Sequence, residues 1–185
     1  DVSAQIAAGQ RNIDAAARFG ARLCRVLPRR ERTKQSYWDL LPFLRGLLPY
    51  AGARRVSLVV ETRSGVDLDV TTMSEFCRAV DSPWFGLVFN PVQFADGGKD
   101  YKEAWAGLRG HVVHLHLRDY RRAAGGELDW AELGEGEMDL AWMIRELRNT
   151  KYSGLIGLEF DKAEPTVAAM KQWHQCCQRL LAATA

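Results

Sequence analysis

The chain has 185 residues, of which 47% are hydrophobic and 26% are charged, and its formal net charge is +2. This is the composition of an ordinary soluble globular domain, and the charge is too small to predict a nucleic-acid partner. No apolar run reaches 18 residues and no signal-peptide pattern opens the chain, so we expect a cytoplasmic protein without a membrane partner.

The spacing of the four cysteines predicts reduced thiols. They form no Cys-x-x-Cys pair, and Cys176 and Cys177 are adjacent, a spacing that rarely gives a disulfide. Free thiols are typical of the reducing cytosol, which agrees with the expected location.

Short apolar runs alternate with longer amphipathic stretches along the whole chain. The spacing of apolar residues predicts one helix, ended by Gly20, and then five strands that are each followed by a helix. The predicted strands are 22–27, 56–61, 85–90, 112–117 and 154–160, and the predicted helices are 4–19, 36–48, 72–80, 101–108, 139–148 and 164–181. Thr71 or Thr72 is the expected cap of the third helix. This order predicts a parallel sheet with right-handed crossovers, and no linker divides residues 1–185.

Four of the predicted strands deliver a polar residue at or just after their carboxyl end. These residues are Glu61, Asn90, Asp119 and Glu159. In parallel α/β folds the carboxyl ends of the strands are where ligands bind. A glutamate at one strand end is usually a solvated group, but the repetition over four strands favours a shared site.

The alternation of side chains along a strand predicts which residues face inward. Glu61, Asn90, His116 and Glu159 each fall on the less bulky face of their strand, and the bulky faces belong against helices. His114 shares the face of His116 one step deeper, where we expect packing or support of the site. Carboxylate, amide and imidazole groups that meet at a barrel mouth are suitable ligands for Mg²⁺, Mn²⁺, Co²⁺ or Zn²⁺.

Three segments carry a resemblance to a known family. VSLVVETRSG resembles a strand that ends in a metal-binding Glu, HVVHLHLRD resembles an H-x-H-x-x-D strand, and LGEGEMDLAWMIRELRNTKYSGLIGLEF resembles a G-x-G loop, a helix and a Y-x-G-x-x-x-x-E strand. Together they resemble the xylose-isomerase-like barrels, the sugar phosphate isomerase/epimerase group that also contains endonuclease IV. The resemblance implies a partial (β/α)₈ TIM barrel, in which residues 1–185 form one domain that holds the last five βα units and lacks the first three strands.

The resemblance to the ketose 3-epimerase branch implies a set of site residues. Glu61, Asn90, His116 and Glu159 stand at the four metal-ligand positions, and Arg122, six residues beyond the His, stands at a substrate-binding position. Many members carry a D-x-x-H motif where this chain has Asn90 and Gln93. Asn can ligate through its carbonyl oxygen, but the exchange removes one negative charge, so we expect a weakened metal site.

The leading functional hypothesis is an isomerase or epimerase that acts on a small sugar or sugar phosphate. The metal would polarise a carbonyl, while Glu61 and Glu159 would remove and return a proton through an enediolate. Arg122, Gln93 and His114 are the expected substrate-side residues. The sequence is also compatible with a homo-oligomer.

Two alternatives stay open. A non-catalytic relative that binds a carbohydrate or a protein partner is favoured by Asn90 and Gln93. A phosphodiesterase similar to endonuclease IV is supported only by a basic cluster. It would need a richer set of ligands for several zinc ions than the four histidines of this chain supply. That basic cluster consists of Arg29, Arg30, Arg32 and Lys34.

Overall fold

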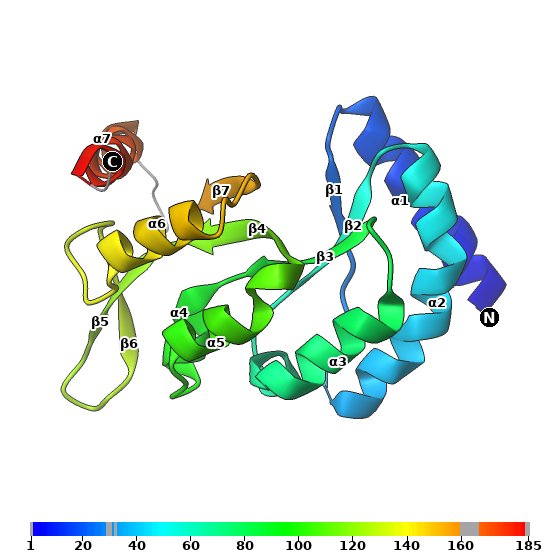
Figure 1. Cartoon of the computed structure of the whole chain (residues 1–185), viewed down its shortest axis with the longest axis horizontal. Helices are drawn as coiled ribbons and strands as arrows, with labels where there is room; N and C mark the ends of the chain where they lie inside the picture. Colours follow the sequence, from blue (N-terminus) through cyan, green and yellow to red (C-terminus); the bar gives the residue numbers. More distant parts are fainter. Residues whose placement is uncertain (1, 29–30, 32, 160–166, 184–185) are drawn as a thin grey trace. The chain divides into compact units, whose positions relative to one another are not determined.

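The computed structural model describes residues 2–28, 31, 33–159 and 167–183. Its strands form a five-stranded sheet in the order β1-β2-β3-β4-β7 and a separate two-stranded sheet, β5-β6 (Figure 1). The chain divides into two compact units, residues 1–114 and residues 115–185. The boundary falls inside β4 (Val112–Leu117), so this strand contributes residues to both units.

The first unit alternates helices with parallel strands. β1 pairs with β2 and β2 pairs with β3, both in parallel, with Cys24 opposite Leu58 and Val59 opposite Gly86. In chain order its elements before β4 are α1 (Val2–Arg18), β1 (Leu23–Arg25), α2 (Lys34–Ala53), β2 (Ser57–Glu61), η1 (Gly65–Leu68), α3 (Val70–Val80), β3 (Phe85–Phe89), α4 (Pro91–Asp96), α5 (Tyr101–Leu108) and η2 (Arg109–His111).

Burial of both faces explains why β2 and β3 are almost wholly apolar. All five residues of β3 are buried, and Leu58 and Val60 of β2 are 1% and 0% exposed. Strands covered on both sides read as continuous apolar runs, which is the pattern that the sequence carries. On the helix side, Phe76 of α3 makes edge-on ring contacts with Tyr37 of α2 and Phe85 of β3, with ring centroids 5.0 and 5.8 Å apart.

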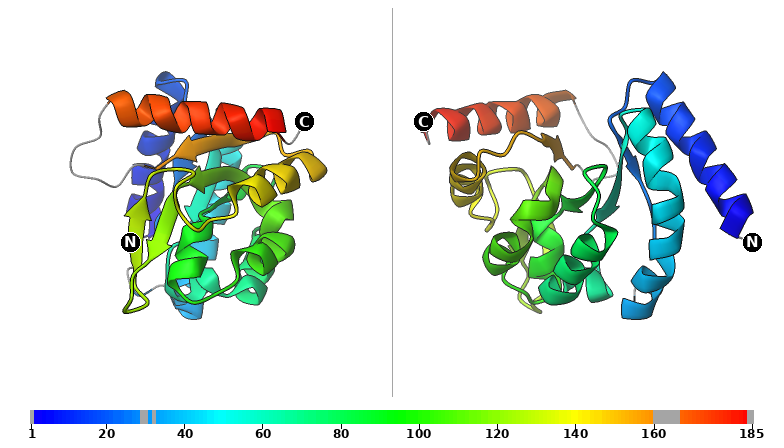
Figure 2. Two further views of the ribbon diagram at one scale, coloured as in Figure 1. Left: turned by 90° about the vertical axis from the view of Figure 1, so that its left-hand side faces the viewer. Right: turned by 45° about the vertical axis from the view of Figure 1, so that its right-hand side comes forward.

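Helices α1 and α2 lie side by side, as the right-hand view in Figure 2 shows. Two glycines allow this close approach, because a Cβ atom on Gly9 would lie 2.5 Å from Leu47 Cδ1 and one on Gly46 would lie 2.8 Å from Ile6 Cδ1. At the other end of the contact, the Asp14 carboxylate accepts a hydrogen bond from the Tyr50 hydroxyl at 2.8 Å. The two helices pack against the sheet, where α1 contacts β1 and α2 contacts β2.

The second unit contains a hairpin that the sequence analysis did not predict. β5 (Asp119–Arg122) and β6 (Leu128–Ala131) pair antiparallel, and Gly126 takes a left-handed conformation (φ +92°) in the turn between them. The unit continues with α6 (Leu140–Asn149), β7 (Leu155–Leu158) and α7 (Val167–Ala183). The N–H of Glu159 donates to the carbonyl of Leu117 at 3.0 Å, which ties the residue after β7 to the end of β4.

Most sequence predictions about the elements are confirmed. The five predicted strands are all present within their predicted ranges, and the helix predicted at 101–108 has those bounds. The predicted cap of α3 is wrong, because the Asp69 carboxylate, and not Thr71 or Thr72, accepts the N–H of Thr72 at 3.1 Å. The end of the last strand at residue 160 and the predicted helix start at 164 lie outside the described residues.

None of the helices in the described parts of the chain has the length and apolar character that a membrane span requires.

Candidate functional site

Glu61 and Asn90 lie together where two neighbouring parallel strands end. Glu61 is the last residue of β2 and is 3% exposed, and Asn90, which follows β3, is fully buried. The side-chain amide of Asn90 donates to Glu61 Oε1 at 3.4 Å. Asn90 precedes the first residue of α4, yet its side chain makes no capping hydrogen bond to that helix. Glu61 and Asn90 therefore lie side by side at the carboxyl ends of β2 and β3.

Arg25 is the partner of Glu61 that the sequence analysis did not predict. It is the last residue of β1, and its Nη1 forms an ion pair with Glu61 Oε2. A buried carboxylate is costly unless it is paired and hydrogen-bonded, and here Arg25 and Asn90 serve one oxygen each. The side chain of Arg25 is 44% exposed, so a solvated guanidinium compensates a buried charge. The predicted strand 22–27 runs past Arg25, so its place at the end of β1 is not visible in the sequence.

The loop after β2 is held by buried polar contacts, which fix the strand end that carries Glu61. The N–H of Thr62 donates to the Val88 carbonyl at 3.0 Å, and the Thr62 hydroxyl accepts the N–H of Asn90 at 3.1 Å. Further along, the fully buried Asp67 carboxylate accepts the Tyr37 hydroxyl at 2.6 Å and the N–H of Arg63 at 3.0 Å. These contacts leave Glu61 on a rigid support.

Gln93 and His114 occupy half-buried positions in the first unit. Gln93 lies in α4, a six-residue helix that the sequence analysis missed and that begins directly after Asn90. His114 lies in β4. His111 precedes the same strand, where burial and then the nearby Arg78 charge lower its pKa, so it is neutral at pH 7.

In the second unit, His116 and Glu159 lie together. Nδ1 of His116 is 3.1 Å from Glu159 Oε1, and the two side chains are 19% and 32% exposed. His116 lies in β4 and Glu159 directly follows β7, so both come from strand ends, as the sequence predicted. The contact between Nδ1 and the carboxylate orients the imidazole ring, so the direction of the other ring nitrogen, Nε2, is fixed as well.

Asp119 shapes the loop that carries the G-x-G motif. It is 1% exposed, and its carboxylate accepts the N–H groups of Gly134, Gly136 and Met138, each at 3.0 Å. A Cβ atom on Gly136 would lie 2.1 Å from Asp119 Oδ1, so the motif needs a residue without a side chain there. The aspartate of the H-x-H-x-x-D motif therefore organises backbone in this chain.

Arg122 lies on the exposed surface of β5. Its guanidinium Nη1 donates to the Gly126 carbonyl at 3.0 Å, across the hairpin turn, and its backbone N–H donates to Glu137 Oε1 at 2.6 Å. The basic residues Arg29, Arg30 and Arg32 of the predicted cluster lie outside the described residues. Lys34 is described, and its Nζ lies 3.4 Å from Glu75 Oε2 at the surface.

Comparison with known proteins gives one family and a group of solved structures. The model of the family described as "Xylose isomerase-like TIM barrel" matches residues 1–179. The xylose isomerase domain protein of Planctomyces limnophilus is 19% identical with a TM-score of 0.75, and the match covers 96% of this chain and 64% of that protein. No curated protein sequence matches the chain.

Two further structures have the same fold. A xylose isomerase-like TIM barrel protein of Mycobacterium smegmatis, solved in complex with magnesium, is 18% identical with a TM-score of 0.78, over 99% of this chain and 69% of that one. An L-ribulose 3-epimerase is 14% identical with a TM-score of 0.76, over 97% of this chain and 67% of that one. The chain thus spans about two thirds of the length of these proteins.

Proposed function

Because the chain belongs to the xylose isomerase-like TIM barrel family, we propose that it isomerises or epimerises a small sugar or sugar phosphate with a divalent metal ion. The observation that carries the proposal is the pairing at the strand ends within each unit. Glu61 lies beside Asn90 in the first unit, and Glu159 lies beside His116 in the second. The L-ribulose 3-epimerase among the similar structures supports the reaction class, and the magnesium-bound protein supports the use of a divalent metal.

The donor chemistry fits a divalent cation. We propose that Glu61, Asn90, His116 and Glu159 are its ligands, since two carboxylates, one amide oxygen and one imidazole suit Mg²⁺, Mn²⁺, Co²⁺ or Zn²⁺. The bound ion would polarise the substrate carbonyl and its neighbouring hydroxyl. Asn90 in place of an acidic ligand lowers the negative charge of this set by one, and Arg25 neutralises part of the rest.

The two glutamates are the proposed proton-transfer groups. One carboxylate removes the proton from the carbon next to the substrate carbonyl, which gives an enediolate, and the other returns a proton to the opposite face. Glu61 is fixed by Arg25 and Asn90, and Glu159 is held beside His116, so both carboxylates have defined directions. We propose that Arg122 and Gln93 contact substrate oxygens and that His114 supports the site from one step deeper.

Isotope exchange tests the proposal. The chain is incubated in D₂O with Mn²⁺ or Co²⁺ and a panel of ketoses and ketose phosphates, and deuterium at the carbon next to the carbonyl is measured by NMR. We expect exchange into at least one sugar, and we expect its loss in Glu61→Gln and in Glu159→Gln. Glu103→Gln, which changes an exposed carboxylate of α5, is the matched control. Exchange that persists in both site variants would contradict the assignment.

A non-catalytic relative that binds a carbohydrate or a protein is the second candidate, and the ion pair between Arg25 and Glu61 favours it. A guanidinium bonded to a carboxylate competes with a metal for the same oxygen. If the chain shows no exchange into any sugar and gains no thermal stability from divalent metals, this second candidate replaces the first.

A further inference from the structure

Arg118 is enclosed between an aromatic ring and a proposed catalytic carboxylate. It directly follows β4 and is 8% exposed. Its Cζ lies 3.9 Å from the centroid of the Trp130 ring, and its Nε lies 3.7 Å from Glu159 Oε2. The other carboxylate oxygen, Oε1, is the one that lies 3.1 Å from His116 Nδ1. The two oxygens of Glu159 thus face two different groups.

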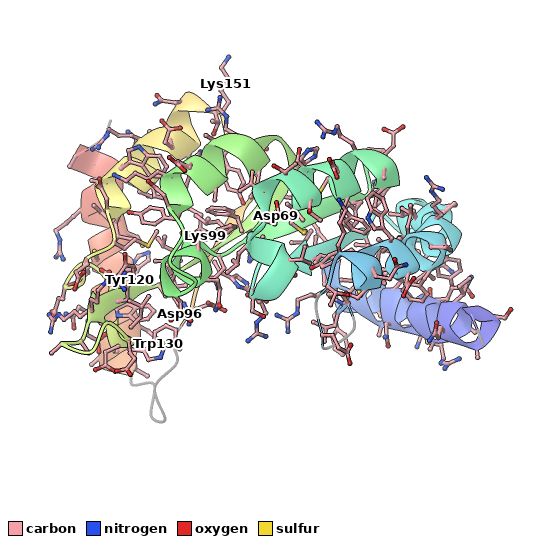
Figure 3. The ribbon with its side chains drawn as sticks, turned by 90° about the horizontal axis from the view of Figure 1, so that it is seen from below. Asp69, Asp96, Lys99, Tyr120, Trp130 and Lys151 are labelled. Carbon is pink, nitrogen blue, oxygen red and sulfur yellow. The ribbon has the colours of Figure 1, made fainter. Side chains whose placement is uncertain are left out.

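Trp130 belongs to the β5-β6 hairpin and not to the large sheet. It lies opposite Tyr120 in the antiparallel pair, and both residues are labelled in Figure 3. The hairpin has a rigid base, because Asp119 at the start of β5 accepts three N–H groups from the loop at 134–138. The β5-β6 hairpin therefore holds the Trp130 ring in a fixed position.

We propose that Trp130 and Arg118 are positioning residues for Glu159, so that the hairpin helps to fix the direction of this carboxylate; the proposal rests on the function proposed above. Guanidinium groups stack well on indole rings, and the stack limits where the guanidinium can go. Arg118 then attracts Oε2, which leaves Oε1 directed at His116. Glu159 needs this help because its side chain is 32% exposed and would otherwise sample several rotamers.

Removal of the Trp130 ring should weaken metal binding. Trp130 is neutral, so Trp130→Ala changes no formal charge near the proposed ion. The released Arg118 either moves away, which frees the Glu159 rotamer, or bonds the carboxylate directly and competes with the metal. Both outcomes weaken metal binding. Loss of an outer residue that orients a ligand typically costs about 10-fold or more in metal affinity.

Metal binding alone gives the test, with no substrate needed. Co²⁺ is titrated into the metal-free chain and its affinity is measured by calorimetry and by its visible absorption. We expect Trp130→Ala to weaken binding about 10-fold, and Trp130→Phe, which keeps an aromatic face, to remain within a few-fold of the parent. Arg118→Lys keeps the charge but loses the planar stack, so its affinity should lie between these two.

Asp129→Ala is the matched control, because Asp129 precedes Trp130 on the same strand and is exposed. It should bind Co²⁺ like the parent. Parental affinity in Trp130→Ala, or an equal loss in Asp129→Ala, would overturn the positioning role while the proposed function stands. A parent chain that binds no Co²⁺ would overturn the proposed function, and the positioning role with it.

Discussion

The carboxylate of Asp119 accepts the backbone N–H of Gly136 at 3.0 Å, in a space that no side chain on residue 136 could share. The same buried carboxylate accepts the N–H of Gly134 and of Met138. Amide groups that are sheltered from water need such partners, since each one left unpaired costs about 1–3 kcal/mol. The conformation of the loop at 134–138 therefore depends on one side chain and one glycine.

Gly136→Ala should accordingly lower the free energy of unfolding by about 2–3 kcal/mol, as overpacking of a buried polar site does. The added Cβ atom would meet Asp119 Oδ1 at 2.1 Å and the Tyr120 carbonyl oxygen at 2.4 Å. Urea denaturation measures the change. Gly110→Ala is the control, because a Cβ atom there meets nothing within 4 Å. Equal stability of the two variants would contradict this account of the loop.

The cap of α3 gives a second prediction. Asp69→Ala removes the carboxylate that accepts the Thr72 N–H and should destabilise the chain by about 1 kcal/mol. Thr71→Ala, at one of the two positions favoured by the sequence analysis, should change stability by less than half as much. Figure 3 labels Asp69 at the start of the helix. Chemical denaturation of both variants compares them directly, and a larger loss in Thr71→Ala would restore the sequence-based cap.

The effect of Asp69 should also depend on pH. The N–H of Thr72, followed by smaller contributions, lowers the pKa of Asp69 below its ordinary value of 3.8, against the opposing effect of burial. A lowered folded-state pKa means that the stabilisation is fully present above pH 3.8 and is lost as the pH falls through the folded-state pKa. The stability difference between the parent and Asp69→Ala should therefore be constant near neutral pH and shrink in acid. A difference that grows as the pH falls would contradict the sign.

The thiols should react in a defined order. Burial raises the pKa of Cys77 to about 12, and the residue is 6% exposed, so at pH 8 it is a protected neutral thiol. Cys24 is half-buried at a cavity between α1, β1 and α2, and burial raises its pKa as well. We expect iodoacetamide to modify Cys24 before Cys77, as peptide mass mapping would show. Faster loss of Cys77 would mean that α3 does not pack as described.

The sequence was sufficient for the strands and for the residues at their ends. Because β2 and β3 are covered on both faces, their apolar runs were easy to detect, and a period of two placed Glu61 and Asn90 on one edge. The same reasoning predicted His116 and Glu159, which lie 3.1 Å apart. These four residues could be predicted because the apolar runs and the alternation of side chains along a strand are visible in one sequence.

The residues that orient those side chains could not be predicted in the same way. Arg25 reads in the sequence as one more surface cation, and only the β1-β2 register brings it to Glu61. The β5-β6 hairpin was missed because three of the four residues of β5 are charged and β6 is only four residues long. Arg118 and Trp130 meet only through that hairpin, so their contact has no signal in the linear pattern.

Asn90 gives the most direct test of the proposed metal site. Asn90→Asp would place a second carboxylate where an amide now donates to Glu61 Oε1 at 3.4 Å. Without metal the two negative charges repel each other, and Arg25 compensates only part of this repulsion, so thermal stability should fall. A bound divalent ion reverses the sign, since carboxylate is a stronger ligand than amide oxygen for hard cations. The same substitution should therefore destabilise the metal-free chain and increase the stabilisation by Mn²⁺.

The decisive measurement is a calorimetric Mn²⁺ titration of the parent, Asn90→Asp and Asn149→Asp. Asn149 is the matched control, because it also donates from its amide to a glutamate oxygen, at 3.2 Å, but on the exposed surface of α6. We predict roughly 10-fold tighter Mn²⁺ binding in Asn90→Asp, which corresponds to about 1.4 kcal/mol, and parental affinity in Asn149→Asp. Equal affinity in the parent and Asn90→Asp, or no binding by either, would contradict a metal site built on Glu61, Asn90, His116 and Glu159.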